Sequence, residues 1–170
     1  PAGGLRQLRG VSSWGGTNEW TVTTSINFSD KLFLGVAINL PQVSSKKISE
    51  YKEEFELNSR EYYWLQEEVL YTTGWGVNSK LGIIAYPCKW LRLGAAFHTP
   101  TLYNLTDSWK TWTYSHLDFG TYELNVPTSY FSYSLMTPWR ANGSLAFIFG
   151  NFGMITADCE FVDYSKIRIS

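Results

Sequence analysis

The stretch that decides the fold runs from Trp139 to Phe149 and reads Trp-Arg-Ala-Asn-Gly-Ser-Leu-Ala-Phe-Ile-Phe. Its odd-numbered positions are mostly apolar or aromatic, while its even-numbered positions begin with arginine, asparagine and serine. Alternation with a period of two is typical of a β-strand with two unlike faces. A Gly-Asn turn follows at 150–151, and the run Ile155–Phe161 alternates again. We therefore predict a β-hairpin over 138–164.

The same period marks two earlier hairpins, which we predict over 18–40 and 76–103. Their turns are the polar Ser29-Asp30-Lys31 and the proline-containing Pro87-Cys88-Lys89. The segments 41–71 and 104–137 between the hairpins are predicted as long extracellular loops, with strand extensions over 62–71 and 122–135 as the alternative. Strict alternation of short turns and long loops is uncommon in compact soluble domains but is typical of outer-membrane barrels.

The composition excludes several classes of function. The chain has 14 basic and 15 acidic residues, so no basic excess indicates a nucleic-acid partner. Its two cysteines have no metal-ligand spacing. No recognisable spacing joins a nucleophile to a base and an orienting group. We therefore expect no enzyme, no catalytic residue, no metal and no cofactor.

Strand length and aromatic placement favour a membrane barrel. Aromatic residues make up 17% of the chain and gather at the predicted strand ends, as at Trp20 and Phe28. Strands that cross a bilayer need about 9 to 11 residues and carry aromatic girdles at both interfaces. The predicted fold is all-β, an antiparallel transmembrane β-barrel. Because barrels begin at about eight strands, the six predicted here are expected to form a single partial barrel domain, 1–170, in the outer membrane of a Gram-negative bacterium.

If one face of each strand meets lipid, the other lines the lumen, since a charge facing lipid at the midplane costs roughly 2 to 4 kcal/mol. The predicted polar network of the lumen comprises Glu19, Lys80, His98, Asp158 and Glu160. The candidates for a ligand pathway are Phe33, Ile84, Tyr86, Ile148, Arg92 and Arg140. The apolar members favour a hydrophobic ligand, and an arginine fork suits a carboxylate. Packing against a plug and a purely structural ion-pair network remain alternatives for these residues.

Three stretches resemble one protein family in the family's own order. They are Leu81–Thr101, with its Leu-Arg-Leu-Gly strand after a proline turn; 15–20 with 30–35; and 137–140 through 157–165. Each is similar to a hairpin of the FadL-type outer-membrane transporters. The resemblance implies a 14-stranded barrel with an N-terminal hatch that passes long-chain fatty acids or aromatic hydrocarbons; some members carry a hemin-receptor label. It also implies a hydrophobic small-molecule ligand and outer-membrane lipid as partners.

A soluble β-sandwich is the alternative fold. Such a binding module, with aromatic platforms for carbohydrate or protein partners, also explains the aromatic content and the strand-rich pattern. It explains less well why turns and long connections alternate. It also leaves the aromatic strand ends without a reason.

Overall fold

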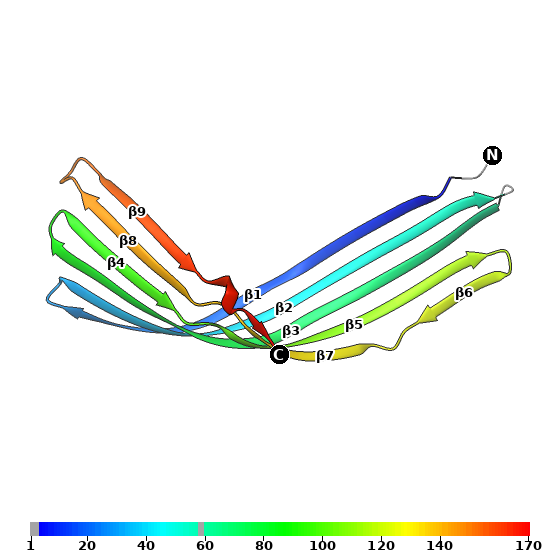
Figure 1. Ribbon diagram of the computed structural model, residues 1–170, viewed down its shortest axis with the longest axis horizontal. Coiled ribbons are helices and arrows are strands. Elements are labelled where there is room, and N and C mark those ends of the chain that lie inside the picture. The colour runs from blue at the N-terminus through cyan, green and yellow to red at the C-terminus, as the bar shows by residue number, and fades with distance from the viewer. Residues whose placement is uncertain (1–3, 58–59) are drawn as a thin grey trace. The chain divides into compact units, whose positions relative to one another are not determined.

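The computed structural model describes residues 4–57 and 60–170, and nearly all of them lie in one antiparallel sheet (Figure 1). Among the described residues no helix is long and apolar enough to span a membrane. The elements are β1 (Arg6–Phe28), β2 (Leu32–Leu57), β3 (Arg60–Cys88), β4 (Leu91–His98), β5 (Leu102–Leu117), β6 (Gly120–Asn125), β7 (Ser129–Met136), β8 (Arg140–Ile148), β9 (Met154–Val162), the 3₁₀ turn η1 (Tyr164–Lys166) and β10 (Arg168–Ile169).

The sheet is an up-and-down meander with interrupted strands. β1 pairs with β2 and β2 with β3, while β3 pairs with both β4 and β5. Further along, β8 pairs with β4, and β6 and β7 pair with β5; β9 then pairs with β8 and β10 with β7. The all-β, antiparallel prediction is confirmed. The sheet is not closed, because within the described chain β1 pairs only with β2 and β9 only with β8.

The chain divides into two compact units, which we treat separately. Unit 2 consists of Asn18–Gln42, Trp75–Asn104 and Tyr133–Ser170, and unit 1 is the rest of the described chain. The alternating segments on which the three hairpin predictions rest lie in unit 2. Several strands, β1 to β3 among them, contribute residues to both units.

The first two turns of unit 2 differ in chemistry. Ser29 and Asp30 both have positive φ, 51° and 55°, and the Lys31 amide donates to the Phe28 carbonyl at 3.1 Å. Positive φ at both central residues defines a type I′ turn, which matches the twist of a hairpin. The second turn lies at 89–90 rather than at the predicted 87–89, so Trp90 lies in the turn and precedes β4. The reason is an irregularity between Ala85 and Cys88, because the intervening Pro87 has no N–H for the ladder.

Proline also ends β4 earlier than predicted. The strand stops at His98, and the segment Thr99-Pro100-Thr101 interrupts it before β5 begins, so Leu102 and Tyr103 belong to β5. A second Thr-Pro pair, at 137–138, separates β7 from β8 in the same way. Threonine hydroxyls accept from backbone amides here: Thr99 Oγ1 from Ser79 N at 2.9 Å, and Thr137 Oγ1 from Thr101 N at 2.8 Å.

The segments predicted as long loops are largely strand. β2 continues to Leu57 and β3 begins at Arg60, so 62–71 extends a strand, while 58–59 lies outside the described residues. Within 104–137, β5, β6 and β7 cover most of the chain, with a break at 126–128. The period of two is faint in unit 1 because polar and aromatic side chains occupy both faces. Aromatic pairs help hold it, as where the rings of Phe55 and Tyr62 stack at 5.0 Å.

Candidate functional site

The sheet of unit 2 has one uncharged apolar face. Register places side chains in rows across β3, β4, β8 and β9, and each row keeps to the face that the alternation predicts. We call the first set the apolar face: Leu81, Phe97, Ala141 and Phe161; Ile83, Ala95, Gly143 and Cys159; Ala85, Leu93, Leu145 and Ala157; Cys88, Leu91, Phe147 and Ile155. The rows between these point to the opposite side of the sheet, which we call the polar face. They hold every charged residue that pairs in these ladders, among them Lys80, Arg92, Arg140, Asp158 and Glu160.

Exposure on β2 and β3 is the reverse of that in a soluble protein. On β2 the apolar side chains of Val36 and Ile38 are 41% and 56% exposed, whereas the polar Asn39 is 0% exposed. On β3 the odd positions Trp75, Val77, Leu81 and Ile83 are exposed, and the even positions between them are buried or half-buried. Soluble proteins bury such apolar side chains and leave amides in water.

Aromatic rings gather at both ends of the apolar face. At one end the Trp139 ring lies 5.8 Å from that of Phe97 and 5.4 Å from that of Phe161. Near the hairpin turns Trp90 stacks on Phe147 at 6.0 Å, with a 7° angle between the planes. The band between these rings carries smaller aliphatic side chains.

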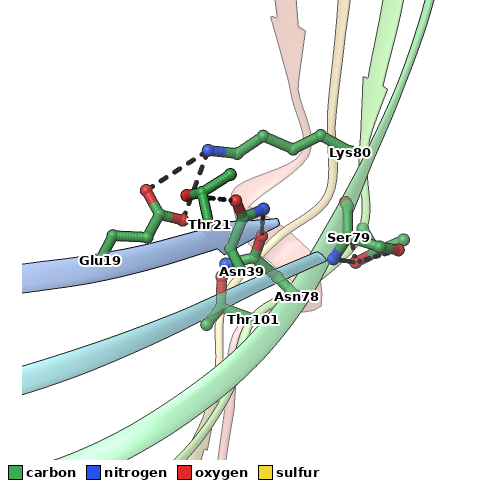
Figure 2. A network of polar contacts seen from close by, with 8 residues as sticks. Glu19, Thr21, Asn39, Asn78, Ser79, Lys80 and Thr101 are labelled. Carbon is green, nitrogen blue, oxygen red and sulfur yellow. Dashed lines mark hydrogen bonds and ion pairs between the residues drawn. The ribbon is translucent and has the colours of Figure 1, made fainter. Parts of the chain in front are cut away.

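A chain of amides and hydroxyls crosses the polar face, as Figure 2 shows. Thr21 Oγ1 donates to Asn39 Oδ1 at 2.9 Å, and Asn39 Nδ2 donates to Asn78 Oδ1 at 2.7 Å. Asn78 Nδ2 in turn donates to Thr101 Oγ1 at 3.1 Å. These bonds satisfy the fully buried Asn39, whose burial without partners would be unfavourable.

The residues predicted for the polar network lie in two groups on the polar face. Lys80 Nζ lies 3.3 Å from Glu19 Oε1, and Lys80, His98 and Arg140 follow one another in register across β3, β4 and β8. Elsewhere on this face Glu160 Oε2 accepts from Asn142 Nδ2 at 3.1 Å, and Asp158 stands opposite Ser144. Their sequence-based assignment to one face therefore agrees with the register.

A hollow of 400 Å³ lies on the polar face. Phe33 and Ile84, both predicted for the ligand pathway, line it. Its floor is made of three residues without side chains, Gly35, Gly82 and Gly94. A Cβ at Gly82 would meet no heavy atom within 4 Å, whereas one at Gly94 would overlap Ser144 Oγ. Glycine inside a strand often marks a place where another molecule approaches the backbone closely. The hollow therefore owes its depth to missing side chains.

Of the other four pathway candidates, two lie near this hollow and two lie away from it. The Tyr86 ring lies 5.2 Å from the Phe33 ring, and the Arg92 guanidinium lies over Tyr86 at 5.0 Å. Neither residue lines the hollow; Tyr86 contacts its lining residue Phe33, and Arg92 contacts Tyr86. Arg140 and Ile148 belong elsewhere: Arg140 is in register with His98, and Ile148, the last residue before the β8–β9 loop, pairs with Met154.

Several lining residues were not singled out from the sequence. They are Ser25, Asn142, Ser144 and the three floor glycines. The sequence does contain a sign of these glycines' role. On each of three strands, the glycine occupies a position that the alternation assigns to the polar face. This pattern predicts a hollow only when the order of the strands in the sheet and their register are known.

Comparison with known proteins adds no relative. No protein-family model matches the chain, and no curated protein matches it.

Proposed function

We propose that this chain forms part of an outer-membrane β-barrel that takes up hydrophobic small molecules such as long-chain fatty acids. The observation that carries the proposal is the reversed exposure along β2 and β3 of unit 2, where aliphatic side chains such as Val36 and Ile38 are exposed while Asn39 is buried. A face of this kind is unfavourable in water and favourable against lipid tails.

The lengths of β8 and β9 support a bilayer as the environment. β8 and β9 have 9 residues each, within the length of about 9 to 11 that a tilted membrane strand needs. The ring clusters around Trp139 and Trp90 occupy the two ends of the apolar face, where interfacial aromatic residues belong. Within the described residues, the sandwich alternative would need a further sheet to cover this face, because all their strands belong to one sheet.

The proposal requires further strands. In hydrocarbon every backbone N–H and C=O must be paired, so the free edges of β1 and β9 must meet other strands. The resemblance of three hairpins to FadL-type transporters indicates a larger barrel that supplies them. In this proposal passage through the barrel is passive.

A hydrophobic cargo is supported by the hollow on the lumen side. Phe33 and Ile84 line it, although a water-filled pore would gain little from them. Gly82 leaves the backbone open beside these side chains, because a Cβ there would meet no heavy atom within 4 Å. An apolar molecule in the hollow would cover both side chains, and burial of apolar area is worth about 25 cal/mol per Å².

The experiment compares two glycine-to-leucine variants of the full-length protein. Gly82→Leu fills the hollow, whereas Gly143→Leu adds the same side chain to the apolar face; neither new Cβ meets a heavy atom within 4 Å. We expect Gly82→Leu to slow uptake of a labelled long-chain fatty acid into cells and Gly143→Leu to leave it unchanged. Both should fractionate with outer membranes and show heat-modifiable mobility. Soluble protein without detergent, or equal uptake by the two variants, would contradict the proposal.

A further inference from the structure

A second hollow, of 440 Å³, lies within unit 1 and gathers charged side chains. Three of them line it: Lys46 on β2, Glu67 on β3 and Lys110 on β5. None of the three forms an ion pair with any residue that the structure describes. Its volume falls within the range of about 300 to 1,000 Å³ that small-molecule sites have. We call it the basic hollow, because two lysines stand against one glutamate.

Two aromatic rings hold Lys46 in place. Its Nζ lies 5.3 Å from the ring centroid of Trp14 and 4.9 Å from that of Tyr71, which also lines the basic hollow. A cation over the face of a ring is attracted by the ring quadrupole. Because this contact uses no carboxylate, the oriented ammonium group can still donate hydrogen bonds to an anion.

Aromatic side chains from three strands share the lining with these charges. They are Tyr71, Trp112 and Tyr130, from β3, β5 and β7. Trp112 Nε1 donates to Glu123 Oε1 at 2.7 Å, which orients the indole, while Tyr71 and Tyr130 are 43% and 73% exposed. Such rings combine an apolar face with a polar edge. A sugar matches them, since its C–H faces pack on rings and its hydroxyls bond to polar side chains.

The alternation along β3 indicates the surroundings of this hollow in the proposed barrel. Glu67 and Tyr71 occupy odd positions, the parity of the exposed apolar Trp75 and Val77. Tyr71 precedes Trp75 by about 13 Å of strand, at about 3.3 Å per residue. Where the apolar positions meet hydrocarbon, the same parity just past an interfacial tryptophan meets lipid headgroups. The long connections of such barrels lie on the extracellular side, so these headgroups belong to the outer leaflet.

We propose that the basic hollow binds the phosphorylated sugar headgroup of a glycolipid in the outer leaflet. This inference rests on the proposed function, because it requires a chain that lies in the outer membrane. The ammonium groups of Lys46 and Lys110 bind the phosphate, and the rings of Tyr71 and Trp112 pack against the sugar. The Glu67 carboxylate accepts hydrogen bonds from sugar hydroxyls and repels a phosphate that carries no sugar.

The test titrates the full-length protein in detergent micelles with lipid and follows the bound lipid by native mass spectrometry. The probes are lipid A, which is a phosphorylated sugar lipid, its dephosphorylated form, and phosphatidylglycerol, which has a phosphate without a sugar. We expect lipid A to bind about fivefold or more tightly than either of the others. The exposed Lys110, changed by Lys110→Gln, should weaken lipid A binding about fivefold, and Lys46→Gln combined with Lys110→Gln about twenty-fivefold.

The matched control combines Lys47→Gln with Lys89→Gln. It removes the same charge from the opposite parity of β2 and from the β3–β4 turn, so binding should stay within about twofold of wild type.

Three contrary results have different meanings. Lipid A binding that is equal in wild type and both lysine variants, in protein that keeps heat-modifiable mobility and fatty-acid uptake, would overturn this inference and leave the proposed function standing. Phosphatidylglycerol bound as tightly as lipid A would also overturn it, because the sugar would then contribute nothing. Protein that is soluble without detergent would overturn the proposed function together with this inference.

Discussion

An arginine on the apolar face should prevent stable membrane folding, whereas the same arginine on the polar face should be tolerated. Leu145 lies on β8 in register with Leu93 and Ala157, all on the apolar face. At the bilayer midplane a lipid-facing arginine costs about 2 to 4 kcal/mol, which lowers the folded-to-unfolded ratio about 30- to 900-fold. Asn142→Arg places the same charge three residues away, beside Glu160, and should change stability by less than about 1 kcal/mol.

The assay is a urea titration of the full-length protein folded into lipid vesicles. The free energy of unfolding is extrapolated to zero denaturant for wild type, Leu145→Arg and Asn142→Arg. Leu145→Ala is the control, because it removes the leucine without adding charge. A large loss for Leu145→Arg alone is expected. Equal losses for the two arginine variants would refute the assignment of the faces.

Three further changes test other parts of the structure. Asn39→Ala breaks the buried amide chain and should lower the free energy of unfolding by about 1 to 3 kcal/mol; an unchanged urea midpoint would count against that chain. Gly15 has φ +134° and a Cβ there would overlap the backbone of β2, so Gly15→Ala should lower the midpoint, and an equal midpoint would exclude that strain. Hydrogen bonds from Tyr62 and then Arg60 lower the pKa of Asp118 below its ordinary value of 3.8. Because this pKa is lowered in the folded state, the stabilisation by ionised Asp118 is complete well above 3.8 and is lost as the pH falls below 3.8 and through the lowered pKa. The stability difference between wild type and Asp118→Asn should therefore stay constant from neutral pH to about pH 5 and shrink as the pH falls further, and a difference that is unchanged in strong acid would refute the pairing.

The sequence predicted unit 2 far better than unit 1. In unit 2 one face is apolar and the other polar, so a period of two identifies each strand and its two sides. In unit 1 the strands carry polar and aromatic residues on both sides, as along β3 from Tyr62 to Tyr71, so the same period is faint. Ladder hydrogen bonds and cross-strand ring pairs, which the sequence of one strand does not reveal, hold these segments in the sheet.

The candidate site could be predicted only in part for a related reason. Phe33 and Ile84 are conspicuous because they are apolar on a polar face, and Arg92 because it is charged. Asn142 looks ordinary in the sequence, and its hydrogen bond to Glu160 depends on the register with the next strand. The hollow itself depends on glycines from three strands that meet in register, a relation between distant segments.

The central claim is that the apolar face meets lipid, and Cys159 tests it most directly. This exposed free thiol lies on the apolar face in register with Gly143, while the flanking Asp158 lies on the polar face. In full-length protein that carries Cys88→Ser, the measurement is quenching of a fluorophore on Cys159 by lipids with nitroxide-labelled chains. We predict strong quenching there and little for a label on Asp158→Cys in a Cys159→Ser background. Equal quenching at the two positions, or rapid reaction of Cys159 with a membrane-impermeant maleimide, would contradict the account.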